Sequence, residues 1–328
     1  MSAWLLFFAG VLCLAGIYAT FAMILNLEAG WGGLWDLGLA GLIAVGAYFY
    51  VIVTSDSADI AFSPGWPMWL GILGAGIFTG FVAFVIGLPA LRLRGEYFLI
   101  TTFAFAEVTR QIITNETGIT RGAFGFTQIS RPFEGLVDVS NYPYVLLGIA
   151  LVAVAGTYAV TRRIGRSPAG RALRAVRDNE VAALALGKDV AAARRRLFVL
   201  AGFLIGITAP VYVWYLSSLQ PGLFTAEITF TAWTALVIGG IGSLRGPLVG
   251  AFLLTVLTSA TQFLQVSPEQ AATLSSLQPL IIGVALILIL RFRPQGLITE
   301  RADLDRARRG SPGSSSPVAG PLSRSAAK

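Results

Sequence analysis

Two charged side chains, Glu107 and Arg110, lie within the otherwise apolar segment 97–113. They are three residues apart, so on a helix they share one face and can form an ion pair. Charges inside a bilayer are costly and usually face a bundle interior or a wet cavity. The pair is therefore a candidate for a polar site on a path through the membrane. A structural ion pair that anchors helices is the alternative interpretation.

Four hydroxyl side chains lie on the same segment and on a short apolar one further along. They are Thr101, Thr102, Thr231 and Thr234. Hydroxyls of this kind can line a pathway, or they can bond back to carbonyls of their own helix. We treat the four threonines and the charged pair as candidates for a substrate path.

The residue types that are scarce exclude several classes of function. The chain has no histidine, a single cysteine, Cys13, and only two lysines, Lys188 and Lys328. Histidine-based catalysis, disulfides within the chain and thiolate zinc sites are therefore excluded. Neither lysine lies in a phosphate-binding P-loop, because Ala182 occupies the place of the first glycine before Lys188. We expect no catalytic residue, no metal site and no cofactor.

The composition predicts a membrane protein. Of 328 residues, 55% are apolar and only 12% are charged, against about 25% charged residues in soluble domains. Basic residues concentrate in 162–196 and from 291 to the end, and none precedes Arg92. Basic segments between apolar ones are typical of cytoplasmic loops and do not indicate a nucleic-acid partner.

The hydropathy pattern predicts an all-α polytopic membrane protein with about 8–10 transmembrane helices. One segment, 231–242, is too short to span and ends in glycines, so we expect a broken or partial helix there. The domain boundaries are 1–298 for the membrane domain, with a cytoplasmic loop at 162–196, and 299–328 for a disordered cytoplasmic tail. The other predicted spans are 4–25, 37–53, 69–90, 97–113, 142–160, 197–216, 246–264 and 273–292.

Arginine positions predict the sidedness of the loops. If 162–196 and the C-terminus are cytoplasmic, 114–141 and 54–68 fall outside and 26–36 falls inside. Pairs of glycines four residues apart, such as Gly76/Gly80 and Gly202/Gly206, allow helices to approach closely. We expect ordinary packing within the chain from them, a special dimer contact being the alternative.

The stretch from Pro168 to Leu186 is predicted to form one amphipathic helix, with Ser167 as its cap and Gly187 as its stop. Its apolar stripe can lie on anionic lipid or insert into a groove of a cytoplasmic partner. The residues alone leave both uses open.

Four stretches resemble the branched-chain amino-acid permeases of ABC transporters, the LivM and LivH type. They are GRALRAVRDNEVAALALG at 170–187, ILNLEAG at 24–30 with GAY at 46–48, LRLRGEYF at 91–98 with TTFAF at 101–105, and GGIGSLRGPLVGA at 239–251 with RFRPQGL at 291–297. The segment WGGLWD at 31–36 departs from the smoother glycine and serine stretch usual in that family.

This resemblance implies an importer subunit without catalytic activity of its own. It makes 162–196 a coupling loop that meets the ATPase, through Gly170, Arg171, Arg174, Asn179, Glu180, Ala182, Ala183 and Gly187. The implied partners are a second permease, two ATPases that bind the ATP, an external binding protein and membrane lipid, in a bacterial cytoplasmic membrane. Urea or simple sugars are alternative substrates within the same superfamily. A membrane-embedded enzyme and a passive channel are alternative classes, which co-purification of an ATPase would separate from a transporter.

Overall fold

The computed structural model describes residues 3–55, 62–93, 95–127, 129–135, 137–138, 141–263, 280, 282–284, 286–288, 291–293 and 295–300. Within these ranges five helical segments are long and apolar enough to cross a membrane, and two shorter helices are also apolar. The five segments contain α1 (Ala3–Leu25), α3 (Met68–Ala90), α6 (Tyr142–Arg166), α9 (Val190–Leu216) and α10 (Ala226–Gly239). The two shorter helices are α2 (Leu39–Thr54) and α11 (Gly246–Phe263).

Another long helix, α4 (Glu96–Asn115), is more polar and carries Glu107 and Arg110. Short elements connect the long helices. They are the π-helical turn η1 (Asn26–Trp31), α5 (Thr117–Thr120), η2 (Gly122–Phe124), β1 (Phe126–Thr127), α7 (Pro168–Asp178), α8 (Glu180–Ala185), β2 (Ser218–Leu219) and η4 (Pro221–Leu223). The strands β1 and β2 pair antiparallel, with Phe126 opposite Leu219.

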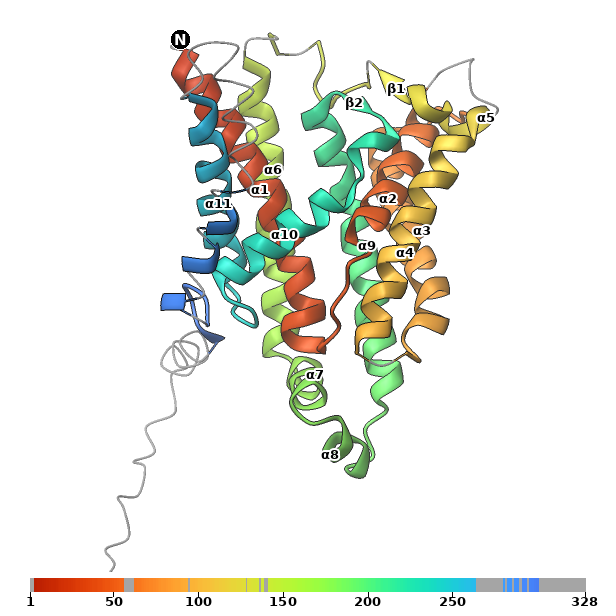
Figure 1. The fold of residues 1–328 in the computed structure, drawn as a ribbon. Helices are drawn as coiled ribbons and strands as arrows, with labels where there is room; N and C mark the ends of the chain where they lie inside the picture. The colour runs from red at the N-terminus through yellow and green to blue at the C-terminus, as the bar shows by residue number, and fades with distance from the viewer. Residues whose placement is uncertain are drawn as a thin grey trace, which may run out of the picture.

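The long helices form two groups, with α10 lying obliquely between them (Figure 1). In one group α1 packs against α6 and α11, and in the other α2 and α9 pack against α3. The helices α7 and α8 project from one end of the molecule, and the β1–β2 ribbon lies at the opposite end. This arrangement agrees with the predicted placement of 114–141 and 162–196 on opposite sides.

Close packing of α3 on α9 depends on small residues, as the glycine spacing predicts. A Cβ added at Gly206 would lie 2.8 Å from the Cα of Gly76, and one at Gly202 would overlap the side chain of Ala83. The glycine pairs therefore serve packing within the chain. Outward-facing residues of α3, such as Ile77 and Phe81, are apolar and more than half exposed, which suits a lipid-facing surface.

The observed helices match seven of the eight predicted spans, and 273–292 lies largely outside the described residues. The predicted broken segment is a short helix, but α10 begins at Ala226, five residues earlier than expected. α6 and α9 also extend into the predicted loop 162–196, to Arg166 and from Val190. Thr299 and Glu300 are described, and the rest of the predicted tail lies outside the described residues.

The prediction of one continuous helix from Pro168 to Leu186 is wrong. Asn179 is extended, with φ −155° and ψ 98°, and separates α7 from α8. Its side-chain oxygen accepts a hydrogen bond of 2.9 Å from the backbone N–H of Ala182. An asparagine side chain that caps the next helix in this way competes with continuation of the preceding one.

Candidate functional site

The charged pair on α4 forms within one helix and faces outward. The Arg110 Nε donates to Glu107 Oε2 at 3.1 Å, and Gln111 Nε2 donates to Glu107 Oε1 at 3.1 Å. The Glu107 side chain is 48% exposed and that of Arg110 is 26% exposed. The pair therefore connects no two helices within the described part of the chain, and it lies on the surface of the subunit.

The four candidate threonines all bond to carbonyls of their own helix. Thr101, Thr231 and Thr234 donate to carbonyls four residues earlier at 2.7 to 2.8 Å, and Thr102 donates to the carbonyl of Leu99. Thr102 is also buried and accepts a hydrogen bond from the Leu37 N–H. Thr102 therefore has a structural role, whereas the other three remain partly accessible.

Two segments that interrupt the regular α-helices meet inside the protein. We call residues 26–38 the first inner turn and residues 239–245 the second inner turn. The Asn26 side chain donates to the Ser243 carbonyl and accepts from the Gly242 N–H, both at 2.7 Å. The Trp31 Nε1 donates to the Gly242 carbonyl at 2.9 Å. Because buried backbone polar groups require partners, these bonds allow two irregular stretches to exist inside an apolar bundle.

The far end of the first inner turn is fixed to α10. The Trp35 and Trp233 rings are stacked, with centroids 5.2 Å apart and planes 5° apart. The Trp233 Nε1 donates to the Asp36 carbonyl, and the Ala40 N–H donates to the Thr229 hydroxyl. Trp35 is 48% exposed, so this stacked pair borders accessible space.

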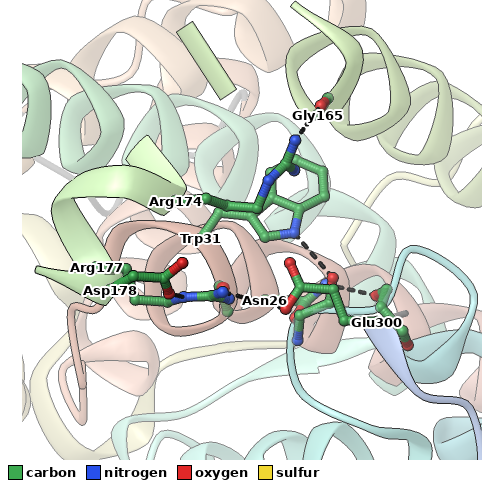
Figure 2. A network of polar contacts seen from close by, with 10 residues as sticks. Asn26, Trp31, Gly165, Arg174, Arg177, Asp178 and Glu300 are labelled. Atoms are coloured by element: carbon green, nitrogen blue, oxygen red, sulfur yellow. Dashed lines mark hydrogen bonds and ion pairs between the residues drawn. The ribbon is translucent and has the colours of Figure 1, made fainter. Parts of the chain in front are cut away.

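Residues 168–187, which were predicted to meet an ATPase, contain both α7 and α8, and we call them the coupling elbow. Its first helix packs closely on the end of α6, because a Cβ at Gly170 would overlap the Ile164 carbonyl. Arg174 donates to the Gly165 carbonyl at 2.9 Å and lies over the Trp31 ring (Figure 2). Arg171 reaches only the Arg166 carbonyl, at 3.3 Å.

The second helix of the elbow, α8, is fixed by one ion pair and a small apolar cluster. Glu180 pairs with Arg194 of α9 at 3.1 Å. Ala183 is buried with Val176 and Val190, while Ala182 receives the Asn179 cap. Gly187 follows with φ +73°, a conformation that favours glycine. Three large apolar side chains of the elbow stay exposed: Val181 at 77%, Leu184 at 52% and Leu186 at 79%.

A cleft of about 200 Å³ lies between α8, the first inner turn and the start of α4. The first inner turn, the loop after α3, the start of α4 and α8 form its walls. It is lined by Gly33, Leu34, Trp35, Leu91, Leu93, Gly95, Phe98, Glu180, Val181, Leu184 and Arg194. Two stretches that carry the family resemblance, 91–98 and 170–187, therefore line the same cleft. The segment 31–36, which directly follows a third such stretch, lines it as well.

Sequence reasoning missed three charged residues. Glu28 and Asp36 are fully buried, and both Glu28 carboxylate oxygens and Oδ2 of Asp36 have no hydrogen-bond partner. The signal was a stretch, 26–36, with two carboxylates, three glycines and no basic residue, which we assigned to a loop. Arg177 was absent from the predicted coupling residues, although it joins the elbow to the first inner turn and to Glu300.

The chain matches a known protein family and several relatives over most of its length. The family model described as "Branched-chain amino acid transport system / permease component" matches residues 7–290. The high-affinity branched-chain amino acid transport system permease protein LivM of Escherichia coli K12 is 29% identical over 304 residues, which cover 86% of this chain and 68% of LivM. A probable LivM of Methanocaldococcus jannaschii is 26% identical, covering 87% of this chain and 91% of that protein. No solved structure matches the chain.

The family match covers all the long helices described above, both inner turns and the elbow. This chain is a multi-pass membrane protein that belongs to the family of permease components of branched-chain amino acid transport systems.

Proposed function

We propose that this chain is the permease subunit of an ATP-driven ABC importer and forms part of the path for branched-chain amino acids. The family match and the names of the relatives support the substrate class. In this proposal the chain itself is not catalytic, and ATP is bound and hydrolysed by partner subunits. It resides in a bacterial cytoplasmic membrane with its C-terminus inside.

The observation that carries the proposal is the construction of the coupling elbow. It projects from one end of the membrane helices and exposes Val181, Leu184 and Leu186. An exposed apolar patch framed by charged residues is typical of a docking surface. Glu180 and Arg194, paired beside it, give that surface a polar edge for an ATPase subunit.

A second permease subunit is supported by the outward face of α4. A hydrated carboxylate and guanidinium on a membrane helix avoid lipid and need a polar environment. Glu107, Arg110 and Gln111 are mutually bonded there, so we place this face against a water-filled path between two permeases. Thr101, Thr231 and Thr234 are further candidates for lining it.

The working cycle follows from these contacts. ATP binding closes the two ATPases, and their motion reaches the permease through the elbow. The path between the two permeases then switches the side to which it opens. An external binding protein delivers the amino acid at the end that carries the β1–β2 ribbon.

The proposal is tested by uptake into vesicles that hold the complete complex. We expect ATP-dependent uptake of radiolabelled leucine that excess isoleucine and valine inhibit, and that urea and ribose do not. Inhibition by urea or ribose instead would assign the chain to another substrate branch. Uptake that continues without any ATPase subunit would contradict an ABC permease altogether.

A further inference from the structure

Arg177, on the last turn of α7, contacts two distant segments of the chain and its neighbour on the same helix, Asp178. Its Nη1 donates to the Gly30 carbonyl of the first inner turn, and its Nη2 donates to Glu300 Oε2 at 3.1 Å. Its Nε donates to Asp178 Oδ1 at 2.9 Å. Figure 2 shows Arg177 together with Asp178 and Glu300, with its bonds as dashed lines. Burial lowers the pKa of Arg177, but Asp178 and Glu300 outweigh it and hold the pKa above its ordinary value.

Glu300 in turn connects Arg177 to the second inner turn. The Leu297 N–H donates to the Ile238 carbonyl at 3.0 Å, and the Ile298 N–H donates to the Gly239 carbonyl at 2.9 Å. The chain that carries Glu300 is therefore bonded to the end of α10. A Cβ on Gly242 would lie 2.9 Å from Glu300 Oε2 and 3.3 Å from Arg177 Nη1, so the ion pair lies directly against this turn.

The two inner turns also lead to the stacked tryptophans. Trp35 belongs to the first inner turn, and Trp233 lies on α10 just before the second. A displacement of Arg177 therefore acts on both segments that carry the tryptophans, the first inner turn and the end of α10. Among the described side chains of α7, Arg177 alone forms bonds to both the first inner turn and the segment that carries Glu300.

We propose that Arg177 is the positioning residue that transmits movement of the coupling elbow to the two inner turns, an inference that rests on the proposed importer function. The residue touches neither ATP nor the transported solute. It fixes the positions of α7, the first inner turn and the end of α10 relative to one another. A displacement of α8 therefore moves the Trp35–Trp233 pair.

Arginine is the residue type that this role requires. Its planar guanidinium offers five N–H donors in a fixed fork, whereas lysine offers a compact ammonium on a flexible stem. Three acceptors surround Arg177 in different directions. A lysine keeps the charge but cannot hold all three acceptors at once, so charge and rigid geometry can be tested separately.

The experiment compares Arg177→Ala, Arg177→Lys and Glu300→Gln in the complete complex reconstituted in vesicles. Uptake of leucine and ATP hydrolysis stimulated by the binding protein are measured on the same preparations. For Arg177→Ala we expect uptake to fall about tenfold, the effect of one lost charge-assisted bond, while ATP hydrolysis stays within about twofold. Arg177→Lys should recover part of the uptake, and Glu300→Gln should lower it about threefold.

Arg163→Ala is the matched control, because Arg163 is an exposed arginine in the last turn of α6. It should leave both uptake and hydrolysis unchanged. The amount of ATP consumed per leucine transported is the decisive ratio, since a merely structural role lowers uptake, hydrolysis and assembly together and leaves the ratio unchanged.

Two results would overturn the role of Arg177. One is wild-type uptake in Arg177→Ala, and the other is an unchanged ratio of ATP to leucine in all three variants. Failure of the importer function is separate, because then the wild-type complex itself shows no ATP-dependent uptake. If Arg177→Ala does not assemble, Arg177→Lys and Glu300→Gln still decide between the two outcomes.

Discussion

Arg110 on α4 and Arg177 on α7 both pair with carboxylates, but their pairs connect different things. Arg110 bonds to Glu107 within one helix, on an outward face. Arg177 bonds to Gly30 and Glu300, which are 147 and 123 residues away in the chain. The first pair is local and exposed, and the second is long-range and partly buried.

The difference indicates what each charge is for. A local exposed pair contributes little to the fold, about 0 to 1 kcal/mol, so its place on a membrane helix is explained by what it faces outside the subunit. A partly buried pair between distant segments fixes their relative positions, because removing one partner leaves the other unsatisfied. We therefore expect substitutions on α4 to change solute handling, and substitutions around the elbow to change coupling or stability.

The largest effect is expected at Glu180 of the coupling elbow. Glu180→Arg would place an arginine against Arg194, where an ion pair of 3.1 Å now holds α8 to α9. We expect uptake to fall about 100-fold, as for a lost interface hot spot of roughly 2.7 kcal/mol, with the permease still inserted. Gly187→Trp should act in the same way. Normal uptake by either variant would remove the elbow from the coupling route.

A smaller effect is expected where the inner turns meet. A Cβ on Gly30 would overlap the Asn26 side chain and lie 2.7 Å from the Gly242 nitrogen. Gly30→Ala should therefore break the Asn26–Gly242 bond and cost about 1–3 kcal/mol, seen as a lower melting temperature and about tenfold less uptake. Gly10→Ala is the control, since no atom lies within 4 Å of its Cβ. Equal melting temperatures for both variants would show that the inner turns do not depend on this contact.

Glu107→Gln tests the exposed ion pair on α4. The carboxylate is nearly half exposed, so the melting temperature should stay unchanged, whereas the KM for leucine uptake should rise roughly threefold to tenfold. Glu96→Gln, on the same helix and also exposed, should change neither quantity. An unchanged KM and rate in Glu107→Gln would exclude the pair from the solute path.

The smallest effect is expected from Trp35→Ala. The variant loses the stacking on Trp233, worth about 1 kcal/mol, while Trp233 retains its bond to the Asp36 carbonyl. Uptake should fall about threefold. Trp69→Ala on α3, which removes a 66% exposed ring, should have no effect on uptake. A similar loss in both variants would show that the stacked pair has no special role.

Periodicity and length were sufficient to predict the long helices, because an apolar run of about 20 residues has few alternatives in a membrane. The glycine spacing correctly predicted packing within the chain, as Gly206 against Gly76 shows. The helix break at Asn179 was missed, because the apolar stripe continues across it. Only the capping bond to Ala182 shows that the side chain ends one helix and begins the next.

The candidate site was harder to predict than the helices. Glu107 and Arg110 were found because charges stand out in an apolar segment, but whether they face inward depends on the rotation of α4 in the bundle. Glu28 and Arg177 were missed for the opposite reason. The partners of Arg177 lie more than 100 residues away in the chain, and the burial of Glu28 depends on how the helices pack around it. No local pattern in the sequence specifies either.

The proposed function requires that the chain moves solute only when an ATPase acts on its elbow. Vesicles are prepared with this permease, the second permease and the binding protein, either with or without the ATPase subunits. Leucine accumulation is then followed after ATP is supplied. We expect accumulation against a gradient only when the ATPases are present. Uphill accumulation in their absence would contradict the claim.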